Sequence, residues 1–175
     1  MPCPFFYIKR GDDKMVIRKA KLEDLEAIAQ IESICFPKEE AANKSQIKER
    51  LTAFCNHFFV AMIENEIVGF INGMVSDSDV IYDEMYENVS LHNENGKWQS
   101  IFGLDVLPAN QHQKIATKLM ESMIEDAKSA GREGLILTCK EHLVGFYETF
   151  GYVCYGKSQS THGGAVWYDM RLTIA

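Results

Sequence analysis

The sequence predicts a single domain of the α/β or α+β class, in which helices cover the faces of a mixed sheet of about seven strands. Two observations lead to this class. Apolar residues recur at helical spacing in several segments, and short apolar runs that suit strands lie between those segments. No repeat, low-complexity tract or long linker divides the 175 residues, so we expect the elements to belong to one fold.

The composition is typical of a soluble globular protein, with 46% hydrophobic and 25% charged residues. The net charge of −7 makes nucleic acid a poor partner, because binding nucleic acid requires a basic face. The five cysteines include no C-x-x-C pair and have no histidine at zinc-ligand spacing, which indicates reduced thiols in a cytoplasmic protein without a bound metal. The longest strongly apolar run, residues 58–63, is too short to cross a membrane. We therefore expect neither nucleic acid nor a membrane as partner, and the sequence leaves open a monomer or a homodimer.

The elements are predicted in order from apolar spacing and turn residues. The first helix should end near Phe36, because a residue before proline avoids helical angles. A hairpin should form around Asn65, which tolerates the left-handed backbone of a tight turn. The long polar segment 76–98 suggests a functional loop, with a short helix near 79–87. The full expected order is a loose leader at 1–14 and then one domain at 15–175, with a strand at 15–19, helices from Leu22 to Phe36 and at 45–54, strands at 58–63, 67–75 and 100–106, a helix from Ile115 that ends before Gly131, a strand at 135–138, a helix at 141–150, and strands at 152–155 and 165–171.

The most informative local feature is the stretch from Leu104 to Leu119. A short apolar strand ends there, a Pro-Ala-Asn turn follows at 108–110, and a long amphipathic helix begins. The first amides of a helix have no partner within the helix, and together with the helix dipole they bind phosphate. The stretch therefore predicts a site for a phosphorylated cofactor, although an ordinary helix start has the same pattern.

Four segments, together with the order of elements, resemble the GNAT superfamily of acyl-CoA-dependent N-acetyltransferases, and within it the arylalkylamine N-acetyltransferases and their microbial relatives. The segments are Glu32-Ser-Ile-Cys-Phe-Pro37, Ile67-Val-Gly-Phe-Ile-Asn-Gly73, Leu91-His92 with Gly96, and Cys139-Lys-Glu-His-Leu-Val-Gly-Phe-Tyr-Glu-Thr-Phe-Gly-Tyr152. The resemblance implies an enzyme that moves an acetyl group from acetyl-CoA directly to a primary amine. It also implies a mostly antiparallel sheet that splays between its fourth and fifth strands, with pantetheine in the gap.

The resemblance implies main-chain contacts to the cofactor around Val106. The pyrophosphate motif reads Gln111-His-Gln-Lys-Ile-Ala116, in which Lys114 stands where glycine is usual. We expect Lys114 to have helical angles, in which case lysine costs little, because main-chain amides do the binding; a left-handed angle would instead strain the turn. The residues expected to bind acetyl-CoA are Leu104, Asp105, Val106, Gln111, His112, Gln113, Lys114, Ile115, Ala116, Thr117 and Tyr147.

Acetyl transfer to an amine needs a donor for the oxyanion, an acid for the leaving thiolate and a base for the amine. The resemblance assigns the amide of Val106 to the oxyanion and makes Tyr147 the acid. A phenol of pKa ~10 can protonate a thiolate whose acid has a pKa of ~8.5. Without the resemblance, Tyr147 would be interpreted as a core aromatic beside Phe146 and Phe150.

The sequence does not identify the base. The two strand histidines of the arylalkylamine enzymes are replaced here by Ser100 and Phe102. Ser100 could hold a water, and His92 and His162 lie on expected loops, but each also suits an ordinary strand or loop residue. Cys139 follows an apolar strand without an obvious base beside it, so we expect it to pack rather than to form an acyl-enzyme.

The acceptor is expected to be a small amine, such as an arylalkylamine or a polyamine. Phe36 and Pro37 match the loop that shapes the amine pocket in the arylalkylamine enzymes, although Phe36 also suits a hydrophobic staple. The segment after Ser76 has an excess of acids that would attract a cationic amine, but a solvated loop has the same composition. These acids are Asp77, Asp79, Asp83, Glu84, Glu87 and Glu94, against Lys97. The alternatives are a non-catalytic acyl-CoA-binding regulatory module, which Lys114 and the missing histidines favour, and an acyltransferase acting on a protein amine.

Overall fold

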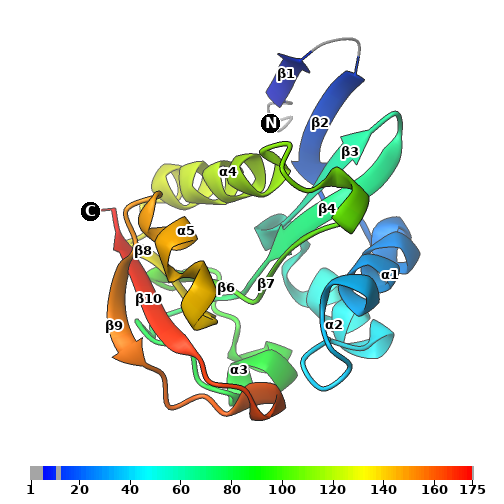
Figure 1. The fold of residues 1–175 in the computed structure, drawn as a ribbon. Helices are drawn as coiled ribbons and strands as arrows, with labels where there is room; N and C mark the ends of the chain where they lie inside the picture. The colour runs from blue at the N-terminus through cyan, green and yellow to red at the C-terminus, as the bar shows by residue number, and fades with distance from the viewer. Residues whose placement is uncertain (1–5, 11–12, 175) are drawn as a thin grey trace. The chain divides into compact units, whose positions relative to one another are not determined.

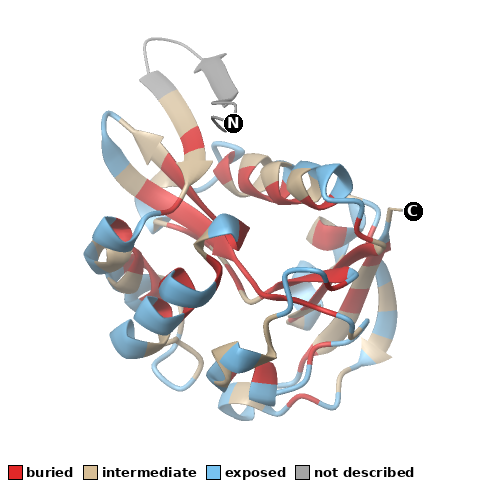
Figure 2. Cartoon of the chain, turned by 180° about the vertical axis from the view of Figure 1, so that it is seen from behind, coloured by how far each residue is buried: buried red, intermediate tan, exposed pale blue. Residues whose placement is uncertain are grey.

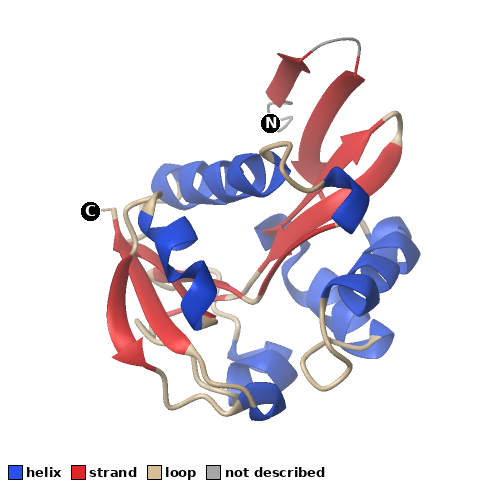
Figure 3. Ribbon diagram, viewed as in Figure 1, coloured by secondary structure: helices blue, strands red, loops and turns tan. Residues whose placement is uncertain are grey.

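The computed structural model describes residues 6–10 and 13–174. They divide into two compact units, of which the first contains the residues up to Asn72 and 103–123, and the second contains 73–102 and the residues from Ile124 onward. Each unit holds one five-stranded sheet (Figures 1 and 3). The long helix α4 (Ile115–Ser129) contributes to both units. Among the described helices, none has the length and apolar character needed to cross a membrane.

The first unit packs two helices on a sheet. The strands are β1 (Phe6–Arg10), β2 (Asp13–Lys19), β3 (Phe58–Ile63), β4 (Glu66–Asn72) and β7 (Gly103–Val106), in that order across the sheet, and the helices are α1 (Leu25–Cys35) and α2 (Lys44–Phe54). Apolar residues of α1 and α2, such as Ile28 and Leu51, are buried with Phe58 and Phe70, whose rings stack 5.6 Å apart. Figure 2 shows this burial along β3 and β4. The helical spacing of the apolar residues in α1 and α2 thus directs them to one face, which packs on the sheet and forms this core.

The second unit contains the other sheet. Its strands are β5 (Val75–Ser76), β6 (Trp98–Ile101), β8 (Gly134–Cys139), β9 (Val153–Lys157) and β10 (Tyr168–Thr173), and its short helices are α3 (Glu84–Glu87) and α5 (Val144–Glu148). The sheet order is β5-β6-β8-β10-β9, and β6 pairs with β8 in parallel, whereas the other pairings described are antiparallel. Leu135, Ile136 and Leu137 of the central strand are almost fully buried. The α/β class and the mixed, mostly antiparallel pairing are confirmed.

The largest difference from the expected elements concerns the predicted strand 100–106. It is divided at Phe102, because β6 pairs with β8 while β7 pairs with β4 in the other sheet. The expected single sheet of about seven strands is therefore two sheets of five. The sequence pattern continues through Phe102 without a turn residue before Gly103, so it gives no signal of this division.

The beginning of the chain also differs from the prediction. Within the expected leader 1–14, residues 6–10 form β1 and pair antiparallel with β2, which begins at Asp13. Residues 1–5 and 11–12 of that leader lie outside the described residues. Two other local predictions are confirmed: α1 ends at Cys35 with Phe36 extended before proline, and the turn between β3 and β4 has positive φ at Glu64 and Asn65.

Gly73 allows the closest backbone approach in the second unit. A Cβ on Gly73 would lie 1.7 Å from the carbonyl oxygen of Ser100. This clash is with the backbone, so it cannot be relieved by moving a flexible side chain. We expect Gly73→Ala to lower the free energy of unfolding by about 3 kcal/mol, measured by urea denaturation. Gly145→Ala is the matched control, because Gly145 is in α5 with no atom within 4 Å of the added Cβ. A Gly73→Ala protein as stable as the control would show that this approach is not present in solution.

Candidate active site

The register of β7 against β4 determines which backbone groups of β7 are available. The pairs are Gly69↔Val106, Phe70↔Asp105 and Ile71↔Leu104, and β7 is the end strand of its sheet. The amide of Leu107 donates to the carbonyl of Val68 at 2.9 Å, which makes Phe70↔Asp105 a hydrogen-bonded pair and its neighbours non-hydrogen-bonded pairs. The amides and carbonyls of Leu104 and Val106 therefore point away from β4. This is the edge on which the resemblance places the cofactor.

Asp105 does not fit its expected role as a cofactor-binding residue. Its amide and carbonyl belong to the pair with Phe70, and its side chain is 1% exposed. Alternation along the strand puts this side chain on the opposite face from those of Leu104 and Val106. Asp105 therefore offers neither main-chain nor side-chain groups at the free edge of β7.

The turn after β7 is held to the end of the strand. The carbonyl of Val106 accepts hydrogen bonds from Gln111 Nε2 at 3.3 Å and from Cys35 Sγ at 3.4 Å. A 3-10 turn at Pro108–Asn110 lies between Val106 and Gln111 along the chain. Gln111, the first residue of the predicted pyrophosphate motif, thus acts here through its side chain to position the turn.

The backbone of the turn enters the left-handed region twice. His112 and Lys114 have φ of 62° and 63°, whereas Gln113 between them is not among the positive-φ residues. The expectation that Lys114 has right-handed helical angles is wrong. A side chain at such a φ costs roughly 1–2 kcal/mol relative to glycine, because Cβ crowds the backbone. Left-handed residues placed beside right-handed ones can turn successive amides toward one side and form a backbone nest for anions.

The turn leads directly into α4. The carbonyl of Lys114 accepts from the amide of Lys118 at 3.1 Å, so Lys114 stands at the N-cap and the amides of Ile115, Ala116 and Thr117 are the ones without a partner in the helix. The first turn of α4 contains no acidic residue. Lys118 pairs with Glu121 at 2.9 Å. The unpaired amides and the helix dipole together suit a phosphate group.

Tyr147 belongs to the second unit and lies on α5. Its side chain is 8% exposed, and the centroid of its ring lies 5.1 Å from that of Phe146 and 6.0 Å from that of Tyr152. Burial, and then the neighbouring Tyr147, raises the pKa of Tyr152 well above its ordinary value, so Tyr152 remains a neutral phenol. Burial raises the pKa of Cys139 to about 12, and this thiol stays protonated, which supports its expected role in packing.

The structure gives limited support to the three candidate bases. Ser100 is fully buried and its hydroxyl donates to the carbonyl of Met74 at 2.7 Å. His92 Nδ1 accepts from the amide of Val75 at 3.1 Å and its Nε2 lies 3.0 Å from Glu94, so both ring nitrogens are engaged. The ring of His162 stacks on that of Tyr86, with the ring centroids 4.7 Å apart.

The expected acceptor groups are partly used for structure. Four of the loop acids have partners in the second unit: Asp79 pairs with Arg171, Asp83 accepts from Ser160 and Thr161, Glu84 accepts from Asn88, and Glu94 pairs with Arg132. These partners weaken the argument that the loop attracts a cationic amine. In the first unit Phe36 is half-buried and Pro37 is exposed, and both precede Ala42, whose amide donates to Glu32 Oε1 at 2.9 Å.

Sequence reasoning missed a buried polar group in the first unit. Glu32, Arg50 and Asp105 are 6%, 6% and 1% exposed and come from α1, α2 and β7. Each lies on an apolar face of its element; Glu32, for example, follows Ile28 and Ile31 at helical spacing, and Arg50 lies between Ile47 and Phe54 at helical spacing. Such isolated charges on apolar faces are the signal that could have found them. Asn72, at the end of β4, is also buried beside them.

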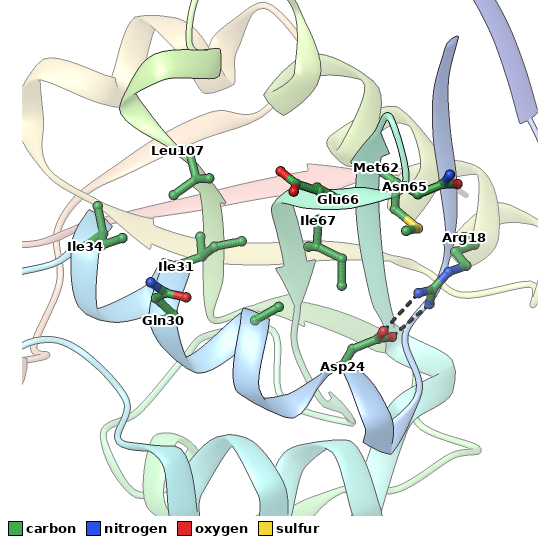
Figure 4. Close-up of a pocket in the computed structure, with 11 residues that line it drawn as sticks. Arg18, Asp24, Gln30, Ile31, Ile34, Met62, Asn65, Glu66, Ile67 and Leu107 are labelled. Carbon is green, nitrogen blue, oxygen red and sulfur yellow. Dashed lines mark hydrogen bonds and ion pairs between the residues drawn. The ribbon is translucent and has the colours of Figure 1, made fainter. Parts of the chain in front are cut away.

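A separate hollow of about 500 Å³ lies in the first unit between α1 and the β3–β4 hairpin (Figure 4). Arg18 donates to both carboxylate oxygens of Asp24 at 2.8 and 2.9 Å. Burial opposes ionisation of Asp24, but the hydrogen bonds from Arg18 and from the Lys21 amide outweigh it and lower its pKa. The hollow is lined by Arg18, Asp24, Ala27, Gln30, Ile31, Ile34, Met62, Asn65, Glu66, Ile67 and Leu107, and thus by none of the predicted site residues.

The left-handed angle at Lys114 leads to a test. We expect Lys114→Gly to be more stable than Lys114→Ala by about 1 kcal/mol, because both remove the charge but only glycine relieves the strained φ. Urea denaturation of the two variants measures this difference. Equal stabilities would contradict the positive φ at this position.

Comparisons with known proteins agree with this geometry. The probable hydrolase YhcX of Bacillus subtilis (strain 168) is 25% identical over 138 residues, which are 74% of this chain but 27% of that protein, so the chain spans about a quarter of this curated relative. The loading GNATL domain of CurA from Lyngbya majuscula has a TM-score of 0.78 at 18% identity, covering 91% of this chain and 97% of that one. The structure of yncA from Salmonella typhimurium with its cofactor acetyl-CoA has a TM-score of 0.67 at 15% identity, covering 92% and 94%. At these identities the structures show the fold. A family model described as an acetyltransferase (GNAT) domain matches residues 24–174, and the chain therefore belongs to the GNAT acetyltransferase family of acyltransferases.

Proposed function

We propose that this acyltransferase moves an acetyl group from acetyl-CoA directly to the nitrogen of a small primary amine. The observation that carries the proposal is the turn at His112–Lys114, which has positive φ at both of these residues and leads directly into α4, whose first amides have no partner in the helix. These amides would hold the pyrophosphate. Leu104 presents its amide and carbonyl, and Val106 presents its amide, at the edge of β7 just before this turn, where pantetheine would add as a strand.

The proposed chemistry uses three groups of the chain. The amide of Val106 would stabilise the oxyanion of the tetrahedral intermediate, because it points away from β4. The phenol of Tyr147 would protonate the departing thiolate of CoA. The acceptor would bind near Phe36 and Pro37. An arylalkylamine, a polyamine or another small amine fits this proposal.

The test is release of free CoA from acetyl-CoA with a panel of amines that includes arylalkylamines, polyamines and a peptide with a free N-terminus. Turnover with a small amine supports the proposal. Binding of acetyl-CoA without turnover across the panel would favour a regulatory module, and turnover with the peptide alone would favour a protein substrate.

Tyr147→Phe tests the acid. We expect kcat to fall about 100-fold, which is within the range of general acid catalysis, with little change in the affinity for acetyl-CoA. Steady-state kinetics and calorimetry measure the two quantities. Tyr155→Phe is the matched control, because Tyr155 is 58% exposed on β9. Unchanged turnover in Tyr147→Phe would remove Tyr147 from the reaction.

Ala116→Glu tests the phosphate site. A carboxylate in the first turn of α4 would repel the pyrophosphate, and we expect acetyl-CoA to bind at least about tenfold more weakly, equivalent to about 1.4 kcal/mol. Calorimetric titration measures the dissociation constant. Ala130→Glu makes the same substitution at an exposed position beyond α4 and should bind as the wild type does. Equal affinity in the two variants would place the phosphates elsewhere.

A further inference from the structure

We propose that Glu32 and Asp105 form a carboxyl pair that holds one proton between them and accepts the proton that the acceptor amine must lose. This inference rests on the proposed function, because it supplies the base that the expected histidines do not provide. It is carried by a group of buried polar side chains of the first unit.

The oxygens of Asp105 have no donor among the described residues. Both Oδ atoms are buried, and neither accepts a hydrogen bond from an N–H or O–H group that the structure describes. The carboxyl groups of Glu32 and Asp105 lie close together, because a Cβ placed on Gly103 would be 3.1 Å from Asp105 Oδ1 and 3.7 Å from Glu32 Oε2. Two carboxylates cannot bond each other unless one carries a proton, so a shared proton is the simplest arrangement that satisfies both.

The surroundings of the pair support the same conclusion. A Cβ placed on Gly103 would lie 3.1 Å from Asp105 Oδ1, 3.3 Å from Asn72 Nδ2 and 3.7 Å from Glu32 Oε2, so these groups converge on a residue without a side chain. Asn72 is 2% exposed, and its Oδ1 has no hydrogen-bond partner among the residues described. A buried, incompletely satisfied polar group next to two acids lowers the stability of the fold. Its presence therefore calls for an explanation such as a catalytic role.

The charges that act on Asp105 come from two helices. Burial, then the charge and hydrogen bond of Glu32, and then Cys35, both on α1, raise the pKa of Asp105 well above its ordinary value, while Arg50 on α2 opposes the increase. A carboxyl group with a raised pKa is a stronger base than an ordinary aspartate. The protonated fraction decreases as pH rises, so the proton-accepting form increases with pH.

The pair lies between the two parts of the first unit that the reaction would use. Asp105 stands between Leu104 and Val106 on the strand proposed to hold the thioester, and Glu32 Oε1 accepts from the amide of Ala42, just after the proposed acceptor loop. Because Asp105 is 1% and Glu32 6% exposed, the proposal requires that the proton pass from the amine to this pair through water.

The proton balance is complete with this assignment. The pair first loses its shared proton to solvent, and the ammonium form of the acceptor then gives one proton to the pair. The nitrogen of the acceptor then attacks the thioester carbon to form the C–N bond. The C–S bond breaks, and the sulfur leaves with its electron pair and takes a proton from Tyr147. Tyr147 regains a proton from the attached nitrogen, and the pair again holds the single proton with which it began.

The first test is an infrared titration of the wild-type protein, which needs no variant to fold. A protonated carboxyl band at neutral pH that disappears at higher pH, and that is absent from Asp105→Asn and Glu32→Gln, supports the pair. Absence of this band from the wild type overturns the proposal.

The second test is the pH profile of kcat/KM for the same variants. Each substitution is isosteric and supplies an N–H donor to the remaining carboxylate, so the packing is retained. We expect kcat/KM to fall about 100-fold and the rise with pH to disappear, whereas the exposed control Glu125→Gln keeps the wild-type profile. Wild-type profiles in both variants would make the pair structural and overturn the inference. If the wild type turns over no amine although the infrared band is present, it is the proposed function that fails.

Discussion

The alternation of paired and unpaired backbone groups along β7 is the constraint on which the proposed site depends. Because the backbone of Asp105 is hydrogen-bonded to the backbone of Phe70, the amides of Leu104 and Val106 are directed to the edge of the sheet. Because side chains alternate, the carboxyl group of Asp105 faces α1. A slip of one residue in this register would exchange the two roles, and both the cofactor edge and the buried acids would be lost.

A second constraint is the connection of Val106 to the turn that follows. Its carbonyl accepts from Gln111 of the turn and from Cys35 of α1, so one backbone group joins the strand, the turn and the helix. The start of α4 is thereby held at a fixed distance from the strand edge. Such preorganisation is what allows main-chain amides to bind an anion without a large loss of conformational entropy.

The sequence predicts those features that depend on neighbouring residues. Proline after Phe36 ends α1, and Asn65 suits the left-handed turn between β3 and β4. The features that it does not predict depend on distant residues or on backbone angles that the residue type does not favour. Nothing around Phe102 indicates that two sheets share the predicted strand, and the convergence of Glu32 and Asp105 requires the register of β7. A lysine likewise gives no local signal of positive φ.

The backbone of Lys114 has a consequence for how such turns are recognised in other chains. Glycine is usual at this position, but the angle that glycine would provide is present here with a full side chain attached. A search that requires glycine would therefore reject a chain whose main chain has the appropriate conformation. Torsion angles, compared directly between structures, are the more reliable criterion for assigning phosphate-binding turns to distant relatives.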